Sequence, residues 1–313
     1  MAKRTRRQHI VPKFYLKGFS DTSEQIRRVE LPGDRSYLLS ITNASVIKDF
    51  YTIILPDGSE SDAFERAFIE IEGAAAEAVR ITTSGIWPLP PESRLALANW
   101  IALQHLRSED IRADQSAMTA QMVRLLVGIS GKAALRQVIE KAEGRTLTEE
   151  ELDWEWKDIT KPGGPDLTPD VNQHMKLLLS MLDGTTRLIY DCHWTLYKFS
   201  RRVLITSDHP VSVVEKPGQP VGLATAEMFF APLNRKLALT IRPRHRLPLE
   251  IRSIPDVVYP GSTLLARTFN KETAARARRY IYHHPDDSPL QELHLPAPET
   301  RLGPTASNID GLI

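Results

Sequence analysis

The sequence has little cysteine and no long hydrophobic run, and each absence excludes a class of protein. Its 313 residues include one cysteine, Cys192, which has no partner for an intramolecular disulfide. No segment approaches the roughly 20 apolar residues that a transmembrane helix requires. The basic N-terminus, MAKRTRRQHIVPKF, is not followed by an apolar run of signal-peptide length. We therefore expect a cytoplasmic protein that does not span a membrane.

An excess of charge of either sign is also missing. Forty Lys and Arg residues face 39 Asp and Glu residues, which leaves a formal net charge of +1. No global field therefore attracts nucleic acid or acidic lipid. The local exception is the N-terminal arm, residues 1–8, which carries Lys3, Arg4, Arg6 and Arg7. We interpret this arm either as a solvated tail or as a contact to the phosphates of a nucleic acid.

Composition and hydrophobic periodicity predict one composite α+β domain. Hydrophobic residues make up 42% and charged residues 25% of the chain, as in ordinary globular proteins. Apolar residues recur at helical spacing in 61–186, whereas 187–268 alternates like antiparallel strands. We therefore expect a helical N-terminal half packed on a C-terminal antiparallel β-sheet, with a closing helix over 270–283. The domain would span 1–284, and residues 285–313 would form a flexible tail.

Local signals place further elements within this outline. Pro12 begins a short apolar helix, and turn signals divide residues 25–60 into two or three strands. Residues 92–126 read as one long helix with a break near Ser108. The acidic segment 146–170 contains Pro-Gly-Gly-Pro, which is typical of a mobile loop that can act as a lid.

The strong catalytic signatures are missing as well: the sequence has no Gly-rich phosphate loop, no Cys-x-x-Cys pair, no HExxH and no Gly-x-Ser-x-Gly. What remains is a set of polar residues at core positions. Trp100, Gln104, Arg107 and Ile111 lie along one helical stripe. A buried arginine needs a carboxylate, and Glu72 on the preceding helix is a candidate. The pair either orients two helices or belongs to a functional site.

A second set of polar residues lies at a predicted strand end, in the run ITSDHPV at 205–211. Asp208 could act there as a general base, a metal ligand or a binder of a polar group, with Ser207 and His209 assisting. The alternative is a turn in which Asp208 caps the backbone before Pro210.

Two other reactive residues carry weaker signals. His9 follows Gln8 directly before the first apolar helix, where it is a ligand, an acid or a substitute for a helix cap. Cys192 precedes His193, but neighbouring residues of a strand point to opposite faces, so this histidine cannot serve the thiol as a base. We interpret Cys192 as a buried core residue.

The run QHIVPKFYLKGFSD at 8–21 resembles the opening of a bacterial and fungal family known as domain of unknown function 4238. Further segments match the family's pattern in order and cover most of the chain: DFYT at 49–52, Glu65 and Glu72, ALQHLR at 102–107, HW at 193–194, ITSDHPV at 205–211 and APLN at 231–234. The chain departs from that pattern at His209, where Asn is expected, and at Ser108-Glu109, which replaces Thr-Pro.

The resemblance implies that five residues belong to one recurrent constellation, and it brings no activity with it. These candidate catalytic residues are His9, Glu72, Gln104, Arg107 and Asp208. Polar side chains that converge in a core are costly unless they bind or catalyse something. The side chains expected to contact a substrate are Gln8, Tyr15, Ser207, His209 and Asn270.

Two functions fit these residues. The first is a hydrolase of the nuclease or phosphodiesterase class, such as a toxin or defence effector. In it Glu72 and Asp208 serve as bases or as ligands of a divalent metal, His9 as the acid, and Arg107 stabilises developing negative charge. The second is a non-catalytic module in which the same side chains bind a small ligand or hold helices against the sheet. Convergence of these residues around one open cleft would favour the enzyme.

Overall fold

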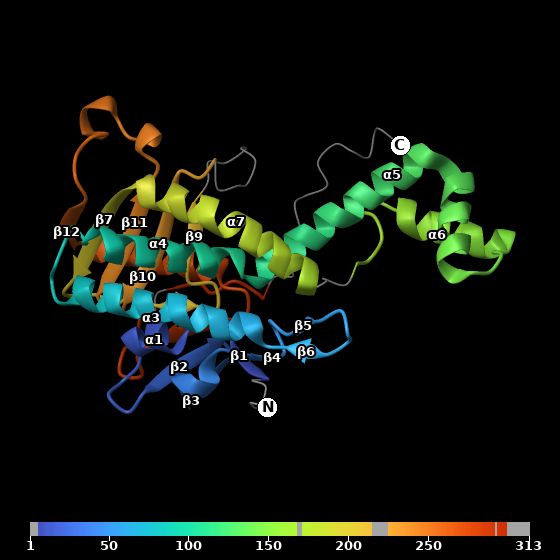
Figure 1. Ribbon diagram of the computed structural model, residues 1–313. Helices are drawn as coiled ribbons and strands as arrows, with labels where there is room; N and C mark the ends of the chain where they lie inside the picture. Colours follow the sequence, from blue (N-terminus) through green and yellow to red (C-terminus); the bar gives the residue numbers. More distant parts are fainter. Residues whose placement is uncertain (1–5, 168–170, 215–224, 292, 299–313) are drawn as a thin grey trace. The chain divides into compact units, whose positions relative to one another are not determined.

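The computed structural model describes residues 6–167, 171–214, 225–291 and 293–298 (Figure 1). Contacts divide these residues into two compact units. The first unit holds the described parts of Met1–Ser108 and Val171–Thr300, and the second holds those of Glu109–Asp170. The single composite domain expected over 1–284 stays a prediction, because contacts within a unit do not show whether that unit folds alone.

The larger sheet of the first unit has five strands in the order β12-β7-β11-β10-β9. Side chains of its strands, such as Trp194 and Phe229, are buried in the main hydrophobic core. The four antiparallel strands are β7 (His193–Phe199), β9 (Ser212–Val214), β10 (Met228–Asn234) and β11 (Leu237–Arg242), and β12 (Val257–Gly261) runs parallel to β7.

The expected helical N-terminal half packed on a C-terminal sheet is wrong, because helices and strands are mixed along the whole chain. A second sheet, in the order β3-β2-β13-β8, joins strands from both ends of the sequence. Periodicity identifies a strand but not the distant strand with which it pairs, so this sheet could not be expected. Its strands are β2 (Gln25–Glu30), β3 (Arg35–Ser40), β8 (Thr206–Ser207) and β13 (Tyr280–His283).

The closing helix expected over 270–283 is also wrong. Helix α8 (Thr263–Arg276) begins earlier, because the Ser262 hydroxyl accepts a hydrogen bond from the Leu265 N–H at 3.0 Å and caps it. The chain then enters β13, where Ile281 is fully buried and pairs with both β2 and β8. Burial within the sheet thus overrides the local helical pattern.

Three helices, α3 (Ala63–Thr83), α4 (Pro91–Leu106) and α7 (Val171–Asp191), pack along one another (Figure 1). The middle helix, α4, buries Trp100 and Ile101 completely. A helix that is apolar on nearly all sides belongs in a core. Because α7 continues to Asp191, the strand expected from residue 187 begins only at β7.

The N-terminal segment of the first unit folds into short elements. β1 (Arg7–His9) pairs with β4 (Val46–Lys48), and α2 (Ile41–Ala44) precedes β4. α1 (Lys13–Leu16) begins directly after Pro12, as expected. A two-stranded hairpin of β5 (Ile53–Ile54) and β6 (Glu60–Ser61) then leads into α3.

One glycine sets the distance between this segment and the larger sheet. A Cβ atom added to Gly18 would lie 2.8 Å from the Cβ of Asn234 and 3.0 Å from the carbonyl oxygen of Leu233. Real Cβ atoms almost never approach another heavy atom as closely as 2.8 Å. The segment after α1 can therefore contact β10 only because residue 18 lacks a side chain.

The second unit is helical. α5 (Glu109–Glu143) starts three residues after the end of α4, which confirms the break expected near Ser108. A second break within α5 lies at Gly131, whose φ of 79° is not helical. The lid-like loop expected over 146–170 is wrong: 149–160 form a helix, and residues 168–170 lie outside the described chain.

That helix, α6 (Glu149–Thr160), starts at a capping box. The Thr148 hydroxyl accepts the Glu151 N–H at 3.2 Å, and the Glu151 carboxylate accepts the Thr148 N–H at 2.8 Å. Acidic residues in the first turn also favour a helix start. The acidic residues at 149–151 therefore favour the start of a helix, although their polarity is also typical of a loop.

The expected tail at 285–313 is described only in part. Leu290, Leu293 and Leu295 pack against a buried cluster that includes Ile281. Residues 292 and 299–313 lie outside the described chain. Among the helices that the structure describes, none combines the length and apolar character needed to cross a membrane.

Arg94 of α4 ties the end of α7 to the larger sheet. Its guanidinium donates to the carbonyl oxygens of Tyr190, at 2.8 and 3.0 Å, and Cys192, at 2.7 Å, and pairs with Asp256. Asp256 also accepts the backbone N–H of Trp194 at 2.9 Å. Only 12% of the Arg94 side chain and 5% of the Asp256 side chain are exposed. Loss of either charge would leave the other buried without its partner.

We expect Asp256→Ala to lower the free energy of unfolding by about 3–5 kcal/mol, because Arg94 loses its carboxylate in a buried position. Urea unfolding measures the change. The control is Asp183→Ala, which removes an exposed ion pair to Arg187 and should cost less than about 0.5 kcal/mol. Equal losses in the two variants would contradict the role given to Arg94.

Candidate functional site

The buried guanidinium of Arg107 is the centre of the candidate site. Arg107 caps the C-terminal end of α4, and 1% of its side chain is exposed. Its Nη1 donates to Glu72 Oε1 at 2.8 Å, and its Nε and Nη2 donate to Gln104 Oε1 at 3.2 and 2.5 Å. Gln104 Nε2 in turn donates to the carbonyl oxygen of Ile10 at 2.8 Å. The expected pairing of Arg107 with Glu72 is present, and the network joins α3, α4 and the segment after β1.

Two aromatic rings line the guanidinium. The Cζ atom of Arg107 lies 5.9 Å from the ring centre of Tyr51 and 5.6 Å from that of Phe68, within cation–π range. Gln8, which is fully buried, holds the Tyr51 segment in place. Its Oε1 accepts the Tyr51 N–H at 2.5 Å, and its Nε2 donates to Thr52 Oγ1 at 3.3 Å. Gln8 therefore positions the Tyr51 ring against Arg107 by holding the chain at Tyr51 and Thr52.

Glu65 lies on α3 two turns before Glu72, on the same face of the helix. Burial, followed by the negative charge of Glu72, raises the pKa of Glu65 to about 7, and Arg107 and the backbone N–H of His9 oppose that rise. The Glu65 carboxyl group can therefore gain or lose a proton near neutral pH. Sequence reasoning placed Glu65 beside Glu72 but did not propose it as a site residue. The seven-residue spacing of two glutamates beside a buried arginine was the available signal.

His9, on β1, is held neutral beside these carboxyl groups. Burial, followed by the positive charge of Lys13, lowers its pKa. Its Nε2 lies 3.2 Å from the carbonyl oxygen of Thr42. A carbonyl oxygen only accepts, so Nε2 carries the hydrogen and Nδ1 keeps its lone pair. His9 is therefore suited to accept a proton.

We call the set of His9, Glu65, Glu72, Gln104 and Arg107 the Glu65–Arg107 cluster. It brings together four of the five expected catalytic residues. His9 and Glu65 are half-buried, and 22% of the Glu72 side chain is exposed, so the cluster reaches solvent. Arg7 and Lys13 add positive charge near His9. The cluster combines a proton donor, an ionised carboxylate and a neutral base with cations that attract an anion.

Asp208, the fifth expected catalytic residue, belongs to another hydrogen-bond network. Its carboxylate accepts three successive backbone N–H groups, those of residues 278–280, at 2.9, 2.7 and 3.1 Å. Ser207 Oγ accepts the His209 N–H at 3.1 Å and donates to the His209 carbonyl oxygen at 2.9 Å. The Asp208 carboxylate thus caps backbone of a distant segment, whereas the alternative drawn from the sequence was a local turn before Pro210. A catalytic role for Asp208 stays a prediction.

Two other expected substrate contacts use their polar atoms within the protein. The buried Tyr15 hydroxyl lies 2.8 Å from Thr206 Oγ1 and donates to a carbonyl oxygen of β10 at 2.7 Å. Burial raises the pKa of Tyr15. Asn270 Oδ1 accepts the Ile205 N–H at 3.1 Å, and its Nδ2 donates to the Val203 carbonyl oxygen at 2.9 Å. Both side chains therefore fix β8 and its neighbouring chain in position.

Burial also keeps two further reactive groups neutral. It raises the pKa of the Cys192 thiol to about 12, and Cys192 Sγ donates to the Leu188 carbonyl oxygen at 3.1 Å. The interpretation of Cys192 as a buried core residue is confirmed. His105, next to Gln104 on α4, has its pKa lowered to about 3 by burial, followed by the positive charges of His209 and Arg276. Sequence reasoning gave His105 no role.

The N-terminal arm is described only from Arg6 onward, so Lys3 and Arg4 lie outside the described residues. Arg6 pairs with Asp49 at 3.1 Å, and Arg7 donates to Asn43 Oδ1 at 2.7 Å. The last residues of the arm are thus held against β4 and α2.

The expected metal ligands, Glu72 and Asp208, contact different partners. Glu72 pairs with Arg107, and Asp208 accepts backbone N–H groups. Among the described residues, no three or more His, Cys, Asp or Glu side chains are grouped so as to hold a metal ion. A metal site formed by these two carboxylates stays a prediction.

Comparison with known proteins gives one match. The model of a family described as "Protein of unknown function (DUF4238)" matches residues 7–287, which include every residue of the Glu65–Arg107 cluster. No curated protein and no solved structure matches the chain.

The raised pKa of Glu65 predicts a pH dependence of stability. The folded state binds the Glu65 proton more tightly than the unfolded state, whose carboxyl pKa is near the ordinary value of 4.5. The free energy of unfolding therefore falls as the pH rises from 4.5 to about 7, and it stays lower above that range. Glu65→Gln should remove about 1–2 kcal/mol of this fall between pH 5 and pH 8. This range is below the full linkage value because the carboxyl group is partly exposed.

Urea unfolding at the two pH values measures that difference. Glu70→Gln, on an exposed position of the same helix, is the matched control and should keep the wild-type fall. If Glu65→Gln also keeps it, the shift assigned to Glu65 is refuted.

Asp208→Ala should lower the free energy of unfolding by about 2–3 kcal/mol, because three backbone N–H groups lose their acceptor. Asp208→Asn keeps one acceptor oxygen and should cost less. Asp57→Ala provides the baseline in the same urea titration, because Asp57 lies in an exposed turn where its carboxylate accepts from the backbone N–H and the hydroxyl of Ser59. Stability of Asp208→Ala at that baseline would rule out the structural role.

Proposed function

This chain belongs to the family of proteins of unknown function DUF4238, and we propose an activity for it from the Glu65–Arg107 cluster: hydrolysis of a phosphodiester bond. The observation that carries the proposal is Glu65, a carboxyl group with a pKa of about 7 beside Glu72 and Arg107. Titratable groups with pKa values near the working pH are suited to acid–base catalysis.

The roles follow from the protonation states. Protonated Glu65 gives its proton to the leaving oxygen as the P–O bond breaks. A water molecule attacks the phosphorus and forms the new P–O bond, and neutral His9 Nδ1 takes the proton that the water loses. The expectation that His9 is the acid is therefore replaced, since its lowered pKa favours the base.

The cations beside the cluster support an anionic substrate. Lys13 and Arg7 lie near enough to His9 to lower its pKa, as does Arg107. Arg107 is bonded to Glu72 and Gln104, so it acts through its field and by holding Glu72 in place. A nucleic acid is the polymer that presents phosphodiesters to such a site, and the adjacent Arg7 adds positive charge toward its backbone. We place this activity in the cytoplasm. The cytoplasm is reducing and its proteins rarely contain disulfides, which fits a chain whose one cysteine is a buried thiol.

A second candidate is a module that binds a small ligand without catalysis. The observation that favours it is the completeness of the Arg107 network, in which every guanidinium nitrogen has an acceptor within the protein. Such a network can orient α3 against α4 with no reaction at all. The two candidates differ in one respect: the enzyme requires that the rate of phosphodiester hydrolysis depend on Glu65, and the module requires no hydrolysis.

Hydrolysis of single-stranded RNA and DNA, measured from pH 5 to pH 9, separates them, because the alkoxide leaving groups of both polymers need the proton of Glu65. We expect wild-type activity to decline above about pH 7, as Glu65 loses its proton, and Glu65→Gln to lose about 100-fold or more in rate. Glu70→Gln should keep wild-type activity. Equal rates in Glu65→Gln and the wild type, or no hydrolysis by the wild type, would refute the enzyme and leave the ligand-binding module.

A further inference from the structure

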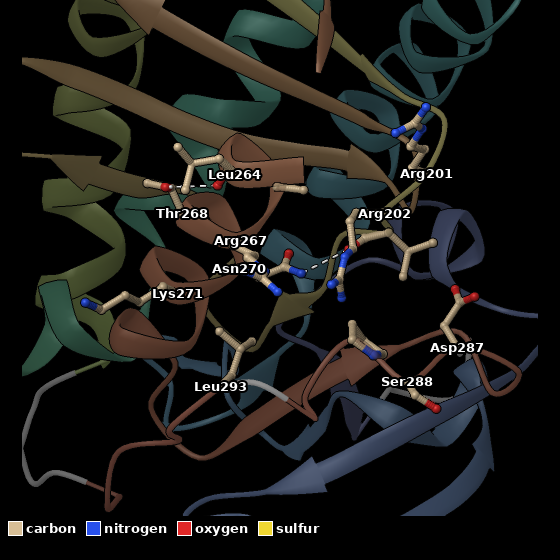
Figure 2. Close-up of a pocket in the computed structure, with 13 residues that line it drawn as sticks. Arg201, Arg202, Leu264, Arg267, Thr268, Asn270, Lys271, Asp287, Ser288 and Leu293 are labelled. Carbon is tan, nitrogen blue, oxygen red and sulfur yellow. Dashed lines mark hydrogen bonds between the residues drawn. The ribbon is translucent and has the colours of Figure 1, made fainter. Parts of the chain in front are cut away.

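The first unit contains a pocket of about 630 Å³ between α8, the turn after β7 and the segment after β13 (Figure 2). Two exposed cations of its lining, Arg201 and Lys271, point away from each other in Figure 2. The amide of Asn270 is used within the protein, because its two ends bond the backbone at Val203 and Ile205. These polar side chains therefore do not converge on one ligand.

The second unit has an exposed apolar surface on α5. Four large side chains of that helix are mostly exposed: Met118 (68%), Met122 (63%), Leu126 (59%) and Ile129 (75%). They are spaced by four, four and three residues, so they share one side of the helix with the half-buried Leu125. We call these five residues the α5 stripe. The stripe extends about 17 Å along the helix axis.

The opposite side of α5 already has a partner. Ala120 and Arg124 are buried there, and Arg124 Nε donates to the carbonyl oxygen of Thr160, the last residue of α6, at 3.1 Å. A surface helix of a globular protein usually has one apolar side, which faces the core, and a polar side in water. Because α5 packs on α6 through one side, the exposed α5 stripe is a second apolar side and indicates a second contact.

The spacing within the stripe favours another helix as the partner. Met118, Met122, Leu125 and Ile129 are separated by four, three and four residues. This is the heptad spacing at which side chains of one helix fit between those of a second helix that lies alongside it. The stripe ends before the break at Gly131, so it lies on one continuous helical segment. Methionine side chains are flexible and adapt to the surface opposite them.

The absence of charge around the stripe favours a second copy of this chain. Between Gln115 and Gly131 the sequence has one ionisable side chain, that of Arg124, which is buried on the side that faces α6. Helices that lie in a lipid surface usually carry Lys and Arg on their polar side. A charged partner would find no opposite charge along the stripe. A second copy presents an equally apolar stripe and meets no electrostatic repulsion.

The size of the stripe also agrees with a dimer. Monomeric soluble proteins rarely expose large contiguous apolar patches. Two copies of the stripe in contact would bury on the order of 1,000 Å² in total, which is near the lower limit for a specific interface. Polar residues lie just beyond both ends, Asp114 and Gln115 before the stripe and Ser130 and Lys132 after it, as in the rim of an interface. We therefore expect a reversible dimer.

We propose that the α5 stripe binds the same stripe of a second copy of this chain, so that two α5 helices pack side by side about a two-fold axis. In such an interface each copy contributes the same residues. This association does not depend on the hydrolysis proposed for the Glu65–Arg107 cluster, because the stripe and the cluster belong to different units. It brings two chains, and hence two clusters, into one particle.

Sedimentation velocity of the full chain over a concentration series measures the association. We expect the wild type to shift from monomer to dimer with a dissociation constant of about 10 μM or lower. Met122→Lys with Ile129→Lys should weaken the dimer at least about tenfold, because the interface would bury unpaired charges. Both positions are exposed, so the fold should be kept. The control is Leu249→Lys with Leu264→Lys, two leucines of the first unit that are each 73% exposed, and it should dimerise like the wild type.

A cysteine cross-link tests whether the contact is between two stripes. Met122 lies near the middle of the stripe, so Met122→Cys chains should be joined by the short thiol cross-linker bismaleimidoethane. The native Cys192 is buried, and Leu249→Cys supplies an exposed thiol outside the stripe, so the wild type and this control should not be joined. A wild type that stays monomeric at every concentration, as expected if a different protein covers the stripe, would overturn the proposal. So would a dimer unaffected by Met122→Lys with Ile129→Lys, or cross-linking with no preference for Met122→Cys over Leu249→Cys.

Discussion

A guanidinium buried in a core must have its charge matched and its N–H groups bonded, and Arg107 imposes this requirement on the first unit. Glu72 supplies the carboxylate from α3, Gln104 supplies the amide oxygen from the preceding turn of α4, and the same amide reaches the chain after β1. Three segments far apart in the sequence are therefore fixed relative to the Arg107 guanidinium. The perturbed protonation of Glu65 and His9 follows from being held in the same desolvated environment.

The charge of Arg107 is used within the protein. Arg107 is enclosed, bonded and paired with the Glu72 carboxylate, so its effect on a bound molecule is through the groups it orients. Enclosure of this kind favours proton transfer, because desolvation moves pKa values.

Much of the cluster could be predicted from the sequence, because its members interrupt apolar helical stripes. Helical spacing places Gln104 and Arg107 on one stripe of α4 and makes Glu72 of α3 a candidate partner, and the structure shows that Arg107 pairs with Glu72. Asp208 could not be placed in the same way. Its partners are backbone N–H groups about seventy residues later, and such groups leave no mark in the side-chain pattern. The β13 strand was taken for helix for a related reason, since only its neighbours β2 and β8 make its burial possible.

The four-stranded sheet has a consequence for the order in which the molecule can form. The hairpin of β2 and β3 is complete by residue 40, but the strand that covers its free edge begins at residue 280. Ribosomes add about 5–20 residues per second, so the nascent hairpin waits on the order of ten seconds or more for β13. During translation the open edge of β2 is therefore exposed to other chains until β13 has been made.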